Sequence, residues 1–237
     1  FAVARNFLRY RWLLIYLFGA SPSCDYTYYP VIYKQLEEIE KCWFDCTGAV
    51  ENLEQYATSL RVSRFGYTDT FQNKHNLYFN SMEEYNRELS RILAMESPEY
   101  LKLGLYRNGE QVQLNGNVLQ SESEFYSSIR LKQNVGKGES QLEALTKRGV
   151  KYLEIRILDI DPFERIGMSL EQLYFLQVFM NYCLFEGSQF IAKDEYEQMT
   201  ANHQLTAIFG RRDDLMLHHY DGQMISLKAF AESMLEK

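Results

Sequence analysis

Apolar and polar residues follow one another along the chain in patterns that predict several helices with marked ends. Residues 1–18 form a nearly continuous helical pattern, which Gly19 and Pro22 end. Three more helices are expected to begin at a serine followed three residues later by Glu or Gln, the capping-box pattern, over 81–95, 140–149 and 169–185. The last of these is apolar nearly all round, so we expect it to be buried. A more polar helix over 193–205 and a final helix over 227–235 follow.

Strand signals gather in the middle of the chain. Residues 150–160 are dense in β-branched and aromatic residues and form the clearest predicted strand, and residues 123–132 form another. The Asn-Gly pair at 108–109, between apolar runs, predicts a hairpin turn. Residues 23–56 are expected to be irregular or mixed, and 56–67 to form a short strand or turn. Strands in the middle with helices on either side indicate the α+β class.

Composition places the chain among ordinary globular proteins and narrows its partners. It has 237 residues, 46% of them hydrophobic and 24% charged, which allows a sizeable core in one large domain or two small ones. The formal charge of −7 argues against a nucleic-acid-coating role, since phosphate binding needs a basic surface. The longest apolar stretch, residues 12–24, is shorter than the roughly 20 residues of a membrane span. We therefore expect neither a nucleic acid nor a membrane as a partner.

The cysteines argue against a disulfide framework and a Cys/His metal site, and the spacing of a glycine-rich loop argues against a Walker-type phosphate-binding loop. Four cysteines are too few for a disulfide framework, so we expect a reducing, cytoplasmic setting. Cys42 and Cys46 are close in sequence, but no second Cys/His cluster follows to complete a metal site. The loop at 136–140 resembles a phosphate-binding loop only superficially, because the Walker spacing is missing, and we expect a mobile hairpin tip.

The predicted strand over 150–160 offers a place for chemistry, because alternation gives it a polar and an apolar face. The two faces carry Tyr152, Glu154 and Arg156 on one side, and Leu153, Ile155 and Ile157 on the other. Glu154 and Arg156 could form a salt bridge on a solvated face. Alternatively they line a polar cavity, where the carboxylate holds a divalent cation and the guanidinium holds a phosphate or carboxylate. Spacing alone leaves both interpretations open.

Arginine occurs together with tyrosine in two other segments. Tyr126 and Arg130 share a face of the predicted strand over 123–132. Arg61 lies near Tyr67 in the strand or turn segment predicted over 56–67. Each pair alone is weak, but three segments that present arginine with tyrosine favour a concave anion-binding site.

Seven segments also resemble a known family in their order and spacing. They are FGASP at 18–22, YATSLR at 56–61, FGYT at 65–68, NVLQ at 117–120, FYSSIR at 125–130, YLEIRILDIDPF at 152–163 and LYFLQVFMNYC at 173–183. Together they resemble bacterial glutamate–cysteine ligase (γ-glutamylcysteine synthetase), of the type found in enterobacteria and in bifunctional glutathione-synthesising enzymes. The resemblance runs from residue 1 to about residue 212. A fusion to a glutathione synthetase domain is one arrangement that it implies.

The resemblance implies a glutamine synthetase-like fold, in which a curved, mostly antiparallel sheet with flanking helices holds the site on its concave face. Residues 1–237 would form the central part of a single catalytic domain. The chain begins at Phe1, without Met and inside a predicted helix. We therefore expect this domain to be incomplete at its N-terminus, where the family carries further metal-binding carboxylates and a histidine ligand.

The resemblance also implies an activity, the ATP- and Mg²⁺-dependent ligation of L-cysteine to the γ-carboxylate of L-glutamate, which begins glutathione biosynthesis. ATP phosphorylates the carboxylate, and the cysteine amine then displaces phosphate from the γ-glutamyl phosphate. Such a reaction needs positioning and charge neutralisation. By motif, the implied roles are Glu154 as a metal ligand, Arg156 as the catalytic arginine at the transferred phosphoryl group, Arg61 as the partner of the glutamate α-carboxylate, Tyr67 and Tyr126 as walls of the cysteine pocket, and Arg130 and Asn117 as further substrate-binding residues.

Two alternatives stay open. One is a related carboxylate–amine ligase with another acceptor amine, which the two pocket tyrosines disfavour. The other is a catalytically inactive fragment or binding module, because one carboxylate cannot assemble a Mg²⁺ site without the family's N-terminal ligands.

Overall fold

The computed structural model of the chain describes residues 1–39, 53–66 and 77–237. The helices are α1 (Ala2–Phe18), α2 (Tyr29–Ile39), α3 (Leu53–Tyr56), α4 (Met82–Leu93), α5 (Pro98–Leu103), α6 (Gln141–Arg148), α7 (Leu170–Phe185), α8 (Lys193–Phe209) and α9 (Leu227–Leu235). The strands are β1 (Tyr106–Arg107), β2 (Glu110–Gln111), β3 (Ile129–Lys132), β4 (Tyr152–Ile155), β5 (Met216–His218) and β6 (Met224–Ser226). This mixture confirms the α+β class.

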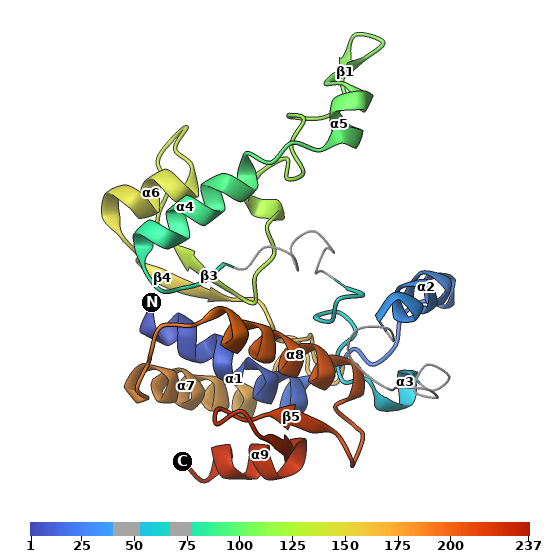
Figure 1. Cartoon of the computed structure of the whole chain (residues 1–237), viewed down its shortest axis with the longest axis vertical. Helices are drawn as coiled ribbons and strands as arrows, with labels where there is room; N and C mark the ends of the chain where they lie inside the picture. The colour runs from blue at the N-terminus through green and yellow to red at the C-terminus, as the bar shows by residue number, and fades with distance from the viewer. Residues whose placement is uncertain (40–52, 67–76) are drawn as a thin grey trace.

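Helix α1 is the centre of a helical layer and lies against α7 and α8 (Figure 1). Most of its apolar side chains are buried, and the ring of Phe7 meets that of Phe179 on α7 edge to face at 5.9 Å. Arg9 is buried in the same layer and forms a 2.6 Å ion pair with Glu195 of α8. Such a cation is tolerated in the layer because it is paired and hydrogen-bonded.

Three smaller units surround this layer (Figure 1). The β3–β4 pair contacts α1 on one side, and α4 and α6 lie beyond it. The β5–β6 pair and α9 lie on the opposite side of the layer, against α8. Helix α5 and the β1–β2 hairpin extend away from the rest of the molecule.

The predicted helix ends are largely confirmed because capping is local. Both α6 and α7 begin with a complete capping box, with Ser140 and Ser169 as the N-caps. Helix α8 continues to Phe209, beyond the predicted end. The segment over 23–56, expected to be irregular or mixed, is mixed in its described part, which contains α2 and α3.

The strands pair in three separate antiparallel ribbons, β1–β2, β3–β4 and β5–β6. Among the described residues they do not join into one curved sheet. The Asn108-Gly109 hairpin is confirmed, since both residues have the positive φ values, 54° and 85°, that a two-residue hairpin turn requires. Strands β3 and β4 are shorter than predicted. A 3-10 helix occupies residues Glu122–Glu124, so β3 begins only at Ile129, and β4 ends at Ile155.

The expectation that the helix at 169–185 is buried is wrong. On α7 only Phe179 and Cys183 are buried, and large apolar side chains such as Val178 and Phe185 face outward. Apolarity all round a helix predicts burial only where neighbours cover every side. Despite its composition, neither α7 nor any other helix in the described ranges is long and apolar enough to cross a membrane.

Candidate functional site

The polar face predicted for residues 150–160 lies on the β3–β4 ribbon. Arg130 of β3 stands opposite Glu154 of β4 in the antiparallel register. The alternate positions of β3, Ile129 and Leu131, are fully buried against the helical layer. The alternation inferred from sequence is therefore confirmed on β3, where Ile129 and Leu131 are buried and Arg130 and Lys132 are partly exposed. On β4 the difference is not marked, because Leu153, Glu154 and Ile155 are all partly buried.

The carboxylate of Glu154 lies between two cations on this face. Its Oε2 is 3.5 Å from Nζ of Lys132, and its Oε1 is 3.5 Å from Nε of Arg156. The side chains of Glu154 and Arg156 are 37% and 35% exposed. Partly exposed pairs at this separation are weak and solvent-screened. Glu154 and Arg156 are thus held loosely, with their charged ends open to a ligand.

Tyr126 supports Arg156 from the segment that leads into β3. Its hydroxyl donates to the carbonyl of Arg156 at 3.1 Å, and the Arg156 guanidinium carbon lies 5.4 Å from the centre of the Tyr126 ring. The amide of Arg156 in turn donates to the carbonyl of Ser128 at 2.9 Å. A cation over an aromatic face is attracted to it. These contacts orient Arg156 without neutralising it.

A second arginine–carboxylate pair lies beside the first and is much tighter. Nε of Arg61 is 2.6 Å from Oδ1 of Asp159, whose side chain is only 2% exposed. The Arg61 guanidinium also donates to the carbonyls of Ile157 and Leu158, at 2.9 and 2.7 Å. A buried carboxylate needs such a partner. Arg61 is therefore fixed in one orientation.

Asp159 also joins the FGASP segment to this pair. Its Oδ2 accepts hydrogen bonds from the amide of Ala20 and the hydroxyl of Ser21, both at 2.8 Å. The amide of Leu60 donates to the Ser21 carbonyl at 2.7 Å. Three segments that are far apart in sequence, around residues 20, 60 and 159, therefore meet at one carboxylate.

The turn that carries Arg61 is anchored on α8. The ring Nε2 of His203 donates to the carbonyl of Val62 at 2.7 Å. Burial lowers the pKa of His203 to about 3, with a smaller effect from Arg11, so the ring is neutral at physiological pH. A Cβ at Gly66 would lie 2.0 Å from the Arg61 carbonyl oxygen, so this tight turn requires glycine.

Positive charge gathers around the phenol of Tyr126. Burial raises the pKa of Tyr126, and the charges of Arg61, Arg156 and Arg11 oppose that rise, together with a hydrogen bond from Arg61. Arg11 is itself buried, and its Nη1 donates to the hydroxyl of Ser128 at 2.8 Å. Among the described residues it forms no ion pair. The site therefore carries more guanidinium groups than carboxylates, which suits an anionic ligand.

The structure brings some of the predicted site residues together and leaves others apart. Glu154, Arg156, Tyr126 and Arg61 form one cluster, with Arg130 across the ribbon from Glu154. Arg130 points its guanidinium at the carbonyls of Ser123, at 2.9 Å, and of Phe125, and it lines a cavity of about 150 Å³ between β3, α4 and α6.

Asn117 is not brought to this cluster. The side-chain amide of Asn117 donates to the Leu93 carbonyl at 2.8 Å, at the end of α4. Tyr67 lies outside the described residues. The substrate-binding roles of both stay predictions.

Sequence reasoning missed three residues of the cluster. Asp159 continues the apolar stripe of Leu153, Ile155 and Ile157, and a carboxylate on a core stripe is a signal of a buried ion pair. Lys132 follows Arg130 on the polar face by the same alternation. Arg11 had no local signal, because its burial depends on Ser128, which is far away in sequence.

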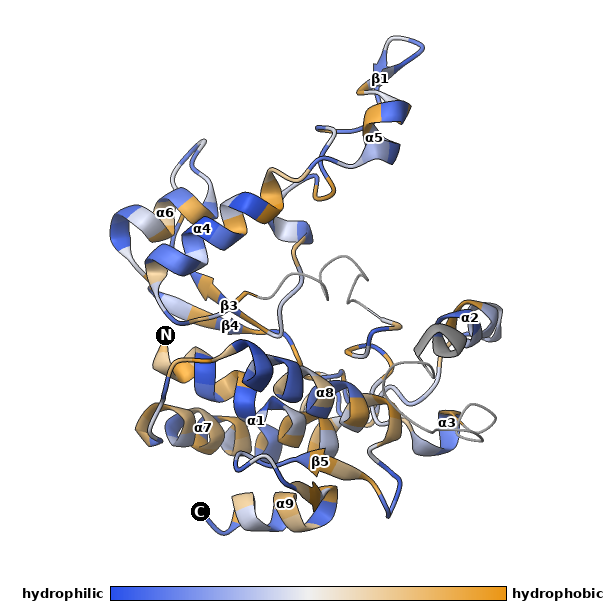
Figure 2. Ribbon diagram, in the orientation of Figure 1, coloured by the Kyte–Doolittle hydropathy of each residue, from blue (hydrophilic) through white to orange (hydrophobic). Residues whose placement is uncertain are grey.

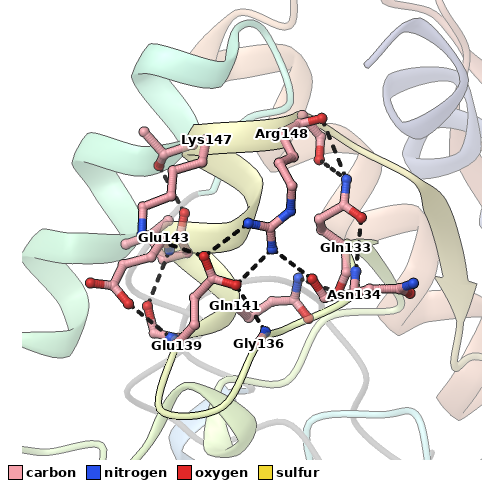
Figure 3. A network of polar contacts seen from close by, with 12 residues as sticks. Gln133, Asn134, Gly136, Glu139, Gln141, Glu143, Lys147 and Arg148 are labelled. Atoms are coloured by element: carbon pink, nitrogen blue, oxygen red, sulfur yellow. Dashed lines mark hydrogen bonds and ion pairs between the residues drawn. The ribbon is translucent and has the colours of Figure 1, made fainter.

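The glycine-rich loop at 136–140 is occupied by its own carboxylate (Figure 3). Glu139 accepts a hydrogen bond from the Gly136 amide at 2.9 Å and forms ion pairs with Arg148 at 2.6 Å and Lys147 at 3.4 Å. These partners, led by Arg148, lower the pKa of Glu139 to about 2. The loop is thus ordered by an internal anion, in keeping with the interpretation that it is not a phosphate-binding loop.

No group of three or more His, Cys, Asp or Glu lies close enough to hold a metal ion within the described ranges. Glu154 is a single carboxylate between two cations. Mg²⁺ prefers several oxygen ligands in octahedral geometry. The described residues by themselves therefore do not fit a Mg²⁺ site.

Comparisons with known proteins place these segments in one family. The sequence model of the family "Glutamate-cysteine ligase" matches residues 1–206. The chain is similar to the glutamate–cysteine ligases of Clostridium acetobutylicum, at 56% identity over 238 residues, and Pseudomonas putida, at 41% over 234 residues. These matches cover 100% and 99% of this chain but 50% and 43% of the relatives, so the chain spans about half the length of the curated relatives it matches.

Comparison with solved structures leads to the same family. The chain is similar to the crystal structure of glutamate–cysteine ligase from Francisella tularensis in complex with AMP, with a TM-score of 0.84 and 33% identity. That match covers 99% of this chain and 46% of the other. A bifunctional glutathione synthetase from Pasteurella multocida matches with a TM-score of 0.59, 25% identity, 99% coverage of this chain and 24% of its own. The chain belongs to the glutamate–cysteine ligase family.

Proposed function

We propose that this chain is the central part of a glutamate–cysteine ligase catalytic domain, in which ATP drives the joining of L-cysteine to the γ-carboxylate of L-glutamate. One observation carries the proposal. The arginines carried over from the family, Arg61 and Arg156, both lie next to Tyr126 in a cluster with excess positive charge. The AMP complex of the Francisella tularensis relative supports nucleotide binding by the family.

The chemistry of the reaction explains what such a cluster is for. A carboxylate is a poor acyl donor, so the γ-phosphoryl group of ATP is first transferred to it, giving ADP and an acyl phosphate. The cysteine amine then attacks the acyl carbon, and the C–O bond to phosphate breaks as the amide forms and a proton leaves nitrogen. Both steps concentrate negative charge on phosphoryl and carboxylate oxygens. Preorganised guanidinium groups stabilise that charge.

The two arginines have different parts in this proposal. Arg156, loosely paired and oriented by Tyr126, approaches the transferred phosphoryl group and the reacting carboxylate. Arg61, fixed by Asp159, binds the α-carboxylate of glutamate. Tyr126, with Tyr67, forms walls of the cysteine pocket. Arg130 and Asn117 remain proposed as outer substrate contacts.

Mg²⁺ is a further part of the proposal. Glu154 would be one ligand, and the remaining ligands would have to come from polypeptide outside the described residues. We likewise propose that β3–β4 belongs to a curved, glutamine synthetase-like sheet. The rest of that sheet would come from polypeptide that corresponds to the part of the relatives outside the match. A cytoplasmic location and a fusion to a glutathione synthetase domain remain proposals of the same kind.

A chimera tests the proposed activity directly. In it, these 237 residues replace the matched segment of the Clostridium acetobutylicum relative. ADP release would be measured with ATP, Mg²⁺ and L-glutamate, and with L-cysteine, 2-aminobutyrate or unrelated amines as acceptors. We expect turnover that prefers cysteine and 2-aminobutyrate. Turnover without that preference would indicate a ligase with another acceptor, and a folded chimera with no turnover would support the inactive binding module.

A further inference from the structure

Helix α7 has a solvent-facing side that is apolar along its whole length. The side chains that face outward there, and that define the α7 outer face, are Leu170, Leu173, Tyr174, Val178, Leu184 and Phe185. Val178 is 66% exposed and Phe185 is 83% exposed. Apolar colours predominate along α7 in Figure 2, and Figure 1 places the helix at the margin of the helical layer.

The inner side of the same helix is packed like a core. Phe179 and Cys183 are buried, and the rings of Phe175 and Phe18 meet at 5.2 Å. Helix α1 therefore covers one side of α7 completely. The outer face repeats the apolar chemistry of the inner one, yet nothing in the described residues covers it.

The outer face is unusual for a surface that water contacts. Large apolar side chains are common singly on surfaces, but several on one helix face mark an interaction site. The polar residues between them are mostly uncharged, such as Gln177 and Asn181, with Glu171 at the start of the helix. A face with so little charge suits a permanent interface more than a transient one.

The segment before α7 extends this apolar surface toward the cluster around Asp159. Ile160 is 79% exposed, and Phe163 and Ile166 are also strongly exposed. Polypeptide that covered both this segment and the α7 outer face would therefore pass close to Arg61 and Arg156. In that cluster the carboxylate of Asp159 is buried and held by Arg61, which leaves Glu154 as the partly exposed carboxylate there, so an occupant that reaches the cluster could add further acids.

We propose that the α7 outer face is the docking surface for the ligase polypeptide that corresponds to the unmatched half of the relatives. The inference rests on the proposed function for the identity of the occupant. Relatives contain about as much chain again as this one, since the matches cover 50% and 43% of their length and 46% of the Francisella tularensis chain. That polypeptide is the occupant, whether it continues this chain or is separate from it. A second copy of this chain would leave the incomplete acid set of the cluster unchanged.

Val178→Glu tests the proposal when it is measured in two settings, the 237-residue chain alone and the chimera. The readouts are the thermal unfolding midpoint and the hydrogen-exchange protection of α7 amides, neither of which requires activity. Leu103→Glu on α5 is the matched control, because Leu103 is also exposed and apolar but lies on the extended arm. Val178→Ser serves if the glutamate variant of the chimera does not fold.

We expect Val178→Glu to leave the unfolding midpoint of the isolated 237-residue chain unchanged. In the chimera, the same substitution should lower the unfolding midpoint by several degrees. That decrease should be larger than the decrease that Leu103→Glu causes in the chimera. α7 amides should exchange at least tenfold more slowly in the chimera than in the chain alone. Equal effects in both settings would overturn the proposal. A second combination of results would also overturn it. Light scattering would show that the isolated chain is a dimer that Val178→Glu dissociates, and the α7 amides of the chimera would still exchange fast. A chimera that passes these tests but shows no ligase turnover would count against the proposed function and leave the docking surface standing.

Discussion

Two arginine–carboxylate pairs lie side by side in the cluster and differ in nearly every physical respect. Arg61 and Asp159 meet at 2.6 Å around a carboxylate that is 2% exposed, and two further hydrogen bonds, from Ala20 and Ser21, fix it. Arg156 and Glu154 are 3.5 Å apart, and each is about a third exposed. In the first pair Asp159 braces the fold of the site and fixes Arg61 in one orientation for its proposed carboxylate ligand. In the second pair Arg156 is held loosely enough to exchange its partner for a ligand. The difference separates a bracing role from a chemical one.

The largest expected effect comes from removing the buried acid. Asp159→Asn removes the negative charge that pairs with the Arg61 guanidinium, which should cost about 3 kcal/mol of unfolding free energy, the lower end of the range for a buried pair because the Arg61 side chain is 27% exposed. Urea unfolding of the chain, with Asp213→Asn as the exposed control, measures it. A loss below about 1 kcal/mol would contradict the bracing role.

Arg156→Ala should act on catalysis rather than on folding. In the chimera we expect kcat to fall by about 10³, because a preorganised donor for developing negative charge is removed. The unfolding midpoint should stay unchanged, since the side chain is partly exposed and loosely paired. Arg107→Ala on the β1–β2 hairpin, where the side chain is exposed, is the control. A near-normal kcat for Arg156→Ala would remove its assigned role.

The neutral His203 should make stability depend on pH. Its pKa is lowered to about 3 when folded, while in the unfolded chain it has an ordinary value near 6.5. The unfolded state therefore binds a proton first as pH falls, so stability present above pH 6.5 is lost on acidification, by up to about 1.4 kcal/mol per pH unit. Urea midpoints at pH 7, 6 and 5 measure the slope. A His203→Gln variant should show a smaller slope between pH 7 and 5, and an identical slope would refute this assignment.

Glu154→Gln should have only a small effect on stability. The carboxylate is exposed and lies 3.5 Å from its two cations, so its loss should change the unfolding free energy by no more than about 0.2–1 kcal/mol. The same urea measurement used for Asp159→Asn compares the two acids directly. Equal losses at Glu154 and Asp159 would erase the distinction between the pairs.

Features that depend on residues close together in the sequence could be predicted from it. Capping at Ser140 and Ser169 acts over three residues, so the starts of α6 and α7 were predictable. Alternation acts within a strand, so the shared face of Glu154 and Arg156 was predictable as well. The family resemblance then supplied roles that spacing alone left open.

The rest depends on contacts between distant segments. The pairing of Arg61 with Asp159 joins residues far apart in sequence, and no local pattern encodes it. The burial of Arg11 depends likewise on Ser128. The exposure of Val178 on α7 could not be predicted from an apolar composition, because burial depends on which polypeptide covers the helix.

Calorimetric titration of L-glutamate into the chimera, with ATP and Mg²⁺ present and cysteine absent, tests the central claim most directly. The claim is that the cluster of Arg61, Tyr126 and Arg156 receives the glutamate that is to be activated. The account predicts saturable binding that Arg61→Lys weakens by at least tenfold, since lysine cannot reproduce the bidentate geometry of the guanidinium. Binding that is absent, or that is unchanged in a folded Arg61→Lys variant, would contradict it.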